Sequence, residues 1–206
     1  MSGHQETVTF KEDAQFGKAS PGKVAMWIFL VTDAMSFSGF LMAYGILRAS
    51  HDWPNPVDAL GGVALSGFMT FLLICSSVSM VLSIDACKRK DREGMLRWLG
   101  ITIGGGIAFL LMQVYEYIHL VNDLGIKFTS FKDGAATALF GTTFYNITAF
   151  HGLHVFTGVC YLIWEYVRAR SGLYDNGDYN RLEIAGLFWH FVDLVWILVF
   201  TFVYLL

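Results

Sequence analysis

Two pairs of ionisable side chains with the same spacing lie inside apolar stretches of this chain. His190 and Asp193 lie within residues 187–206, which are apolar and long enough to cross a bilayer, and His151 and His154 lie within a second apolar stretch. Residues three apart project from one face of a helix. An ionisable side chain at membrane depth costs at least a few kcal/mol, so it is normally paired and faces other protein. Both pairs therefore predict polar sites between helices.

Other ionisable residues lie at similar depth in further apolar stretches. With a helical rise of about 1.5 Å per residue, Asp33 and Asp193 both lie about 13 Å from one membrane surface, close to the midplane. We expect a central polar layer there that forms an interhelical network, and an outer layer near the opposite surface that contains Glu116 and His119, again three residues apart. The central layer contains Asp33, His154, His190 and Asp193.

Three kinds of chemistry use such residues. Neutral imidazole and carboxylate bind metals, and His151 or His154 together with His190 could ligate a b-type haem in a membrane anchor. Glu116 and His119 supply the Glu-x-x-His motif of di-iron bundles once, whereas those sites need it twice. Intramembrane carboxylates also mark the pathways of protons or small solutes in transporters. The third interpretation is structural pairing across helices, which we favour because an unpaired buried charge is costly.

Tryptophan residues accompany these polar positions. Trp27 lies near a predicted membrane surface, where interfacial tryptophan is normal. Trp189 and Trp196 lie deeper, and we expect them to pack against other helices or to donate their indole N–H groups to a partner. A cofactor is not needed to explain any of the three.

Composition places the chain among integral membrane proteins. Of its 206 residues, 55% are hydrophobic and 15% are charged, and its net charge of -3 includes no basic cluster that could bind nucleic acid. A hydrocarbon core takes about 20 helical residues to cross, and continuous apolar runs favour helices over strands. We predict an all-α, five-helix transmembrane bundle, with a polar segment at residues 1–23 and a single domain at 24–206. The predicted spans are 24–47, 60–85, 96–120, 135–167 and 184–206.

Basic residues are distributed unequally between the two sides of this predicted bundle. The side richer in Lys and Arg is normally cytoplasmic. The N-terminal segment lacks the apolar core of a signal peptide. We therefore expect the N-terminus inside and the C-terminus outside. The inner side would hold Lys11, Lys18, Lys23, Lys88, Arg89, Lys90, Arg92, Arg97, Arg168, Arg170 and Arg181, and the outer side Arg48, Lys127 and Lys132.

Four segments that carry the polar residues match a known family in order. They are Trp27-Ile-Phe-Leu-Val-Thr-Asp33, Glu116-Tyr117, Phe150-His-Gly-Leu-His-Val155 and Phe188-Trp-His-Phe-Val-Asp-Leu-Val-Trp196. With these segments the chain resembles subunit III of haem–copper terminal oxidases, which include cytochrome c and quinol oxidases, in their short five-helix bacterial form. Many members carry Glu in the first motif, where this chain has Asp33. The other motif residues are Trp27, Tyr117, His151, Gly152, Trp189 and Trp196.

The resemblance implies a non-redox core subunit of a proton-pumping oxidase that reduces oxygen to water in aerobic respiratory electron transport. It implies no catalytic residue, metal or cofactor in this chain, because haem and copper belong to the partner subunits I and II. This chain would stabilise subunit I, bind phospholipid and support proton uptake in the bacterial plasma (inner) membrane. Longer members begin with two further helices that enclose lipid. Here we expect lipid on the exposed face, or a partner helix in that place.

Overall fold

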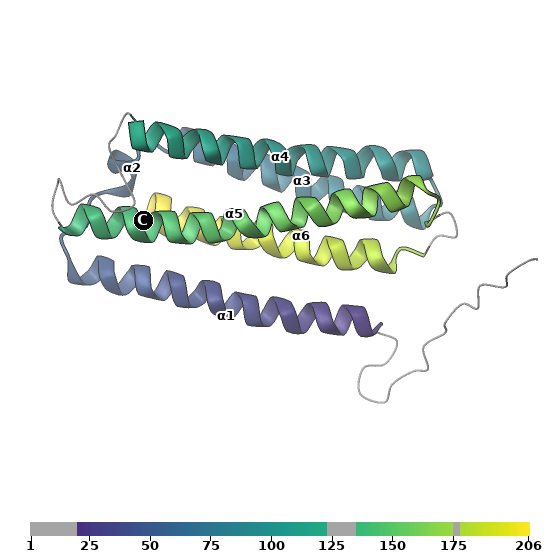
Figure 1. Cartoon of the computed structure of the whole chain (residues 1–206), viewed down its shortest axis with the longest axis horizontal. Coiled ribbons are helices and arrows are strands. Elements are labelled where there is room, and N and C mark those ends of the chain that lie inside the picture. The colour runs from purple at the N-terminus through teal and green to yellow at the C-terminus, as the bar shows by residue number, and fades with distance from the viewer. Residues whose placement is uncertain (1–19, 123–134, 175–177) are drawn as a thin grey trace, which may run out of the picture.

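Five long helices pack side by side in antiparallel order in the computed structural model of the chain (Figure 1). The structure describes residues 20–122, 135–174 and 178–206, and these residues form no strand. Within this part of the chain, five helices are long and apolar enough to cross a membrane, which confirms the predicted fold class. The elements are α1 (Pro21–Ser50), α2 (Pro56–Ala59), α3 (Ala64–Lys88), α4 (Arg92–Asn122), α5 (Ala135–Arg170), α6 (Asn180–Val199) and a terminal π-helical turn, η1 (Phe200–Leu205).

Two helices begin at residues that differ from the sequence-based prediction, and the local structure explains both differences. Helix α1 begins at Pro21, earlier than expected, because the Ser20 side chain accepts the Lys23 N–H at 3.4 Å and proline needs no N–H partner in the first turn. Helix α3 begins at Ala64, later than expected, because a short additional helix, α2, precedes it. Gly61 and Gly62 have φ values of 71° and 113°, which end α2 and turn the chain into α3.

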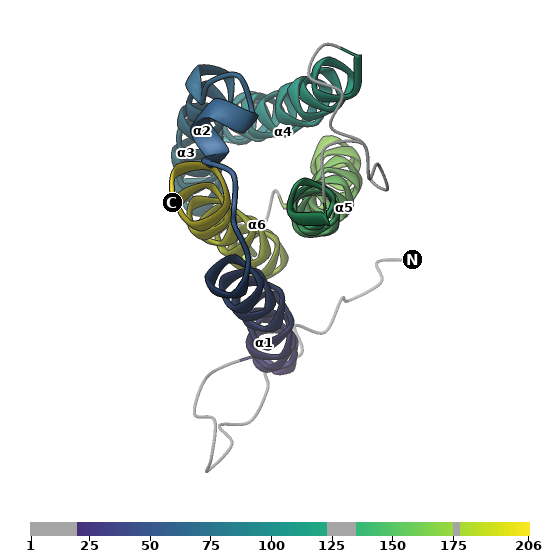
Figure 2. The same ribbon diagram turned by 90° about the vertical axis from the view of Figure 1, so that its left-hand side faces the viewer.

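Helix α6 lies at the centre of the bundle. It contacts α1, α3 and α5, while α4 packs against α3 and α5 on the far side (Figure 2). In the most apolar 18-residue stretch of the last membrane-spanning helix, which includes α6, 50% of the residues are buried. In the corresponding stretch of α1, 17% are buried. Among the long helices of the described chain, α1 has extensive contacts with α5 and α6 alone. Most of its surface therefore faces outward.

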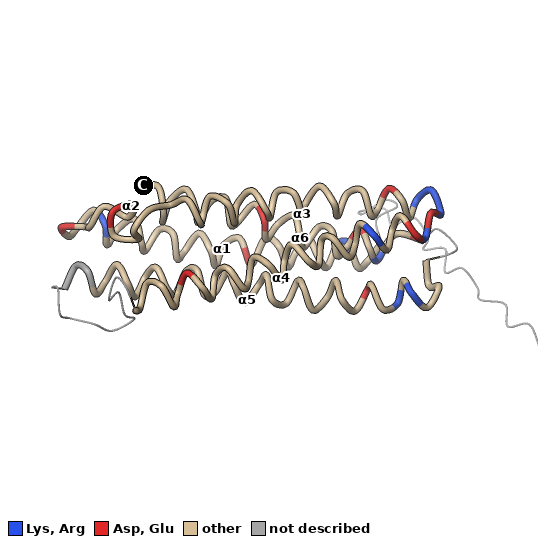
Figure 3. The backbone as a smooth tube through the Cα atoms, turned by 90° about the horizontal axis from the view of Figure 1, so that it is seen from above, with Lys and Arg blue, Asp and Glu red and all other residues tan. Residues whose placement is uncertain are grey.

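Basic side chains gather at one end of the bundle (Figure 3). This end contains the start of α1, the turn between α3 and α4, the end of α5 and the start of α6, so Lys23, Lys88, Arg92, Arg170 and Arg181 meet there. Arg48 lies at the opposite end. Lys11, Lys18, Lys127 and Lys132, which also entered the orientation argument, lie outside the described residues. The orientation in the membrane stays a prediction.

Close approach between α4 and its neighbours depends on Gly106. A Cβ atom at this position would lie 2.6 Å from Trp189 Cη2 and 2.6 Å from Val159 Cγ2. Both neighbours are buried and belong to different helices, α6 and α5. Because packed interiors have little room for an added methyl group, Gly106 sets the distance between three helices. Gly104, on the same helix, has no neighbour within 4 Å of such an atom.

We therefore expect Gly106→Ala to destabilise the folded chain in detergent by about 1–3 kcal/mol, the usual cost of overpacking. Gly104→Ala is the matched control, and it should leave the midpoint of thermal or denaturant unfolding unchanged or slightly raised. Equal effects of the two substitutions would contradict the close approach of α5 and α6 to Gly106.

Candidate functional site

Asp33 and His154 form a hydrogen-bonded pair between α1 and α5. The Oδ1 atom of Asp33 lies 3.1 Å from Nε2 of His154, and the Nδ1 atom of His154 lies 2.8 Å from the carbonyl oxygen of Phe150. Because a carbonyl only accepts, Nδ1 must carry a proton. The Nε2–Oδ1 contact then holds one shared proton, as imidazolium with carboxylate or as imidazole with carboxylic acid. Either way the pair has no net charge, which suits a site inside hydrocarbon.

Aromatic rings surround the His154 side of this pair. The imidazole makes edge contacts with the rings of Phe150 and Phe37, at centroid distances of 4.7 Å and 5.2 Å. Asp33 is 8% exposed, and its second oxygen, Oδ2, is buried without a hydrogen-bond partner in the part of the chain that the structure describes. The pair is therefore shielded, and its single hydrogen bond fixes α1 against α5.

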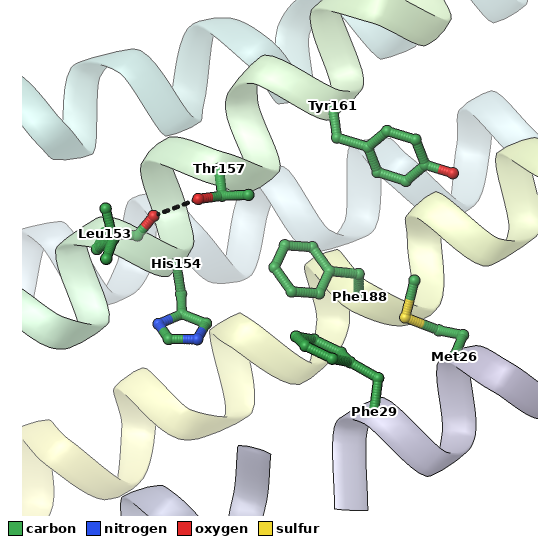
Figure 4. A pocket seen from close by; sticks show the side chains of 7 residues that line it. All are labelled: Met26, Phe29, Leu153, His154, Thr157, Tyr161 and Phe188. Carbon is green, nitrogen blue, oxygen red and sulfur yellow. Dashed lines mark hydrogen bonds between the residues drawn. The ribbon is translucent and has the colours of Figure 1, made fainter. Parts of the chain in front are cut away.

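A groove opens beside His154 between α1, α5 and α6 (Figure 4). Its volume is about 430 Å³, and its walls are almost entirely apolar. The Thr157 hydroxyl at its edge is already satisfied, because it donates to the carbonyl oxygen of Leu153 at 2.8 Å. The lining side chains are Met26, Phe29, Leu153, His154, Thr157, Tyr161 and Phe188.

His190 and Asp193 lie in a second polar cluster, between α3 and α6. Nδ1 of His190 lies 2.5 Å from the Ser77 hydroxyl. The same hydroxyl is within reach of Asp193, but neither Asp193 oxygen has a hydrogen bond of good geometry in the described chain. No hydrogen bond among the described residues joins this cluster to Asp33 or His154. The four residues of the expected central layer thus form two separate contacts, not one network, because α6 lies between them.

His151 is fully buried and its imidazole has no hydrogen-bond partner among the described residues. It packs instead against the rings of Trp196 and Phe109, at centroid distances of 5.0 Å and 5.8 Å. The adjacent Gly152 leaves space for Gln113, whose Oε1 atom would lie 2.7 Å from a Cβ atom at that position. Of the two histidines in the Phe150–Val155 segment, only His154 makes a polar contact across helices among the described residues.

The outer residues Glu116 and His119 do not share an environment. Glu116 is buried and accepts hydrogen bonds from Ser66 Oγ at 2.7 Å and from the Tyr204 hydroxyl at 2.9 Å, which joins α3, α4 and η1. His119 is exposed and stacks against Tyr115, with ring centroids 6.4 Å apart. Three helical residues differ in direction by about 60°, which is enough to place one side chain inside and the other outside. Glu116 and His119 therefore do not form the shared outer polar layer that their spacing led us to expect.

The deep tryptophans donate their indole N–H groups, as predicted. Trp189 Nε1 donates to Ser76 Oγ at 3.1 Å, and Trp196 Nε1 donates to Thr70 Oγ1 at 2.9 Å. Trp27 is 57% exposed near the basic end. Tyr117, another motif residue, donates to Thr148 Oγ1 at 2.7 Å.

Sequence reasoning missed the hydroxyl groups of α3 that these residues need. Ser66, Thr70 and Ser77 are spaced by four and seven residues along one apolar helix, a signal that could have identified a polar face. They satisfy groups on both α4 and α6. The partners are Ser66, Thr70, Ser76 and Ser77.

A buried pair also closes the basic end. The Tyr174 hydroxyl donates to Glu165 Oε2, and both side chains are at most 3% exposed. Burial raises the pKa of Tyr174 well above its ordinary value, and the hydrogen bond to Glu165 adds to that effect. The phenol therefore stays protonated at neutral pH and can act as a donor. It ties the turn after α5 to the helix itself.

The geometry supports pairing between helices better than ligation. Within the described residues, no group of three or more His, Cys, Asp and Glu side chains is arranged to hold a metal ion. A haem between His154 and His190 would need both imidazoles on one cavity, whereas His154 lines the groove between α1, α5 and α6, and His190 lines another between α3 and α6.

Comparison with known proteins agrees with the motif segments. Residues 7–206 match the family described as cytochrome c oxidase subunit III. Three similar proteins are each named cytochrome c oxidase subunit 3. The one from Synechocystis sp. is 38% identical over 87% of this chain and 73% of its own length. The one from Alkalihalophilus pseudofirmus is 31% identical over 100% of this chain and 93% of its own. The one from Bacillus subtilis is 32% identical over 95% of this chain and 96% of its own.

A double-mutant cycle on Asp33→Leu and His154→Phe should give a coupling free energy of about 0.6–1.7 kcal/mol in the unfolding of the chain, the range for polar contacts in membrane proteins. The control cycle combines Asp33→Leu with His190→Phe, and it should be additive to within about 0.5 kcal/mol, because the two residues are not in contact. A coupling as large in the control as in the test pair would show that the central residues form one network after all.

Proposed function

Because this chain belongs to the cytochrome c oxidase subunit III family, we propose that it is a non-redox subunit of a haem–copper terminal oxidase that reduces oxygen to water in aerobic respiration. The observation that carries the proposal is that several intramembrane polar groups, among them Asp33, His154 and Glu116, pair with side chains of the same chain instead of converging on one site. On this proposal haem and copper lie in the partner subunits, and this chain supplies protein structure.

The proposed role towards subunit I is stabilisation by packing. The described surface carries many large apolar side chains, for example Met35 at 69% exposed on α1 and Leu111 at 67% on α4. Such a surface suits either lipid or another membrane subunit. We place the complex in a bacterial plasma (inner) membrane, with the basic end of this chain inside, in keeping with the distribution of Lys and Arg. Subunit I is the proposed main partner and subunit II a further one.

We also assign lipid binding to the groove beside His154 (Figure 4). A volume of about 430 Å³ and apolar walls suit an acyl chain. At the basic end of the groove, Arg168 and Arg181 lie close enough to Tyr161 to act on it electrostatically. Their charges would attract the phosphate of a lipid whose chain lies between Met26 and Phe188.

Support of proton uptake is the third part of the proposal. Exposed carboxylates accompany the basic side chains at the inner end: Asp85 beside Arg89 at 2.9 Å, and Glu93 beside Arg97 at 3.0 Å. Exposed carboxylates exchange protons with water quickly at a membrane surface. They could raise the local supply of protons for a neighbouring subunit.

Gentle purification through an affinity tag on this chain tests the proposal. The tagged chain should bring with it a larger membrane subunit that carries haem and copper, identified by mass spectrometry and by its optical spectrum. After the subunits are separated in stronger detergent, this chain should show no Soret band. A Soret band in the isolated chain, or recovery of the chain with no haem-containing partner, would contradict the proposal.

Filling the groove beside His154 tests lipid binding separately. We expect Thr157→Trp to remove a tightly bound phospholipid from the purified complex, as measured by native mass spectrometry, because the indole would occupy the acyl site. Val114→Trp is the control, since Val114 is 55% exposed on α4, away from the groove. Unchanged lipid content in both variants would exclude this groove as the site.

A further inference from the structure

The seam between α3 and α6 contains a second groove, separate from the one beside His154. Its volume is about 470 Å³, and it extends from the basic end of the bundle to His190. Apolar side chains, among them Val81, Ile84 and Leu187, form most of its wall. Figure 2 shows α3 and α6 side by side at one edge of the bundle. We call this edge the α3–α6 face.

The charged groups at the mouth of this groove are already paired within the chain. Glu183 lies 2.6 Å from Lys23 Nζ, an ion pair by distance although it is not aligned as a hydrogen bond. Asp85 pairs with Arg89. The Lys88 ammonium lies over the ring of Tyr179, 4.7 Å from its centroid. These charged groups therefore do not need an ionic ligand to balance them.

The deep end of the groove has a polar atom, Nε2 of His190, that lacks a partner among the described residues. His190 is half-buried and uses Nδ1 to contact Ser77, and within the described chain its Nε2 atom makes no hydrogen bond. Both oxygens of the neighbouring Asp193 are buried without a well-formed hydrogen bond. Ten residues separate His190 from the start of α6, about 15 Å along the helix, and His190 lies within the membrane-spanning part of α6, one turn nearer the basic end than Asp193. Unpaired polar groups at that depth are expensive.

The described faces of α1 and α4 show no such demand at membrane depth. On α1, the exposed hydroxyls of Thr32 and Ser36 donate to carbonyl oxygens of their own helix, so nothing is required of a neighbour. On α4, exposed side chains at membrane depth such as Ile101 and Leu111 are apolar. Hydrocarbon can cover these surfaces without a penalty. The α3–α6 face differs because a polar group opens towards its groove.

We infer that the α3–α6 face is the surface on which another oxidase subunit docks, through a transmembrane helix that presents a hydroxyl, amide or phenol group opposite His190. This inference rests on the function proposed above. A side chain of that kind can donate to, or accept from, Nε2 of His190, whichever way the Ser77 hydroxyl points.

A lipid is the weaker candidate for this groove on physical grounds. Acyl chains have no hydrogen-bonding atoms, and phospholipid headgroups remain at the surface of a hydrocarbon core about 30 Å thick. A helix from another subunit supplies both apolar area for Val81 and Leu187 and a polar group at the depth of His190.

Photo-crosslinking in the intact membrane-bound complex tests the inference. A benzophenone amino acid would replace Val81 on the α3–α6 face, Val31 on α1 or Ile101 on α4; these side chains are 52%, 53% and 54% exposed. We expect a crosslink to a larger subunit from position 81, with a yield at least several-fold above those from positions 31 and 101. A larger yield from position 31 or 101, a crosslink from 81 to a second copy of this chain, or only lipid adducts at 81 would overturn the inference.

Retention of the chain in the complex gives an independent measurement. His190→Phe should release the chain from the purified complex at lower detergent concentration than the wild type. His154→Phe is the matched control, because it removes an imidazole that is bonded inside the chain, and it should alter stability of the chain more than retention. If the chain co-purifies with an oxidase but crosslinks through another face, this inference fails while the proposed function stands; if it co-purifies with no oxidase, the proposed function fails.

Discussion

The hydrogen bond between Asp33 and His154 is the interaction on which the register of α1 against α5 depends. Helix α1 is the least buried of the long helices, and its contacts are confined largely to α5 and α6. Apolar packing alone would specify its register weakly, since lipid competes for the same side chains. One shared proton between a carboxyl and an imidazole fixes that register without leaving a net charge in hydrocarbon. The groove beside His154 exists because α1 is fixed in this way.

The other polar residues of the membrane-spanning helices fall into two classes, according to whether their polar atoms have hydrogen-bond partners within the chain. Glu116, Trp189 and Trp196 find hydroxyl partners on α3 or η1, so these contacts fasten the core of the bundle. His190 is only partly satisfied and opens to the groove at the α3–α6 edge, while the buried Asp193 beside it has no well-formed hydrogen bond in the described chain. A self-contained membrane protein would have little use for such an edge. On the function proposed above, the chain docks on a partner subunit through this edge.

Sequence alone is sufficient for the properties that depend on position along the membrane normal. Continuous apolar runs predict the five spans, and helical rise places Asp33 and His154 at similar depth, where the structure brings them together. Depth contains no information about direction around a helix axis. That is why depth groups His190 with His154 although α6 turns it towards α3, and why it does not distinguish the environments of Glu116 and His119. Short hydroxyl side chains such as Ser77 carry too little hydropathy signal to be assigned partners in advance.

A structure of the intact oxidase in a lipid nanodisc, at a resolution that shows side chains, is the most direct test of the central claim. Asp33 Oδ1 and His154 Nε2 should lie at hydrogen-bond distance, about 3 Å, and every imidazole of this chain should be free of metal. A porphyrin or metal ion coordinated by His151, His154 or His190 would contradict the account.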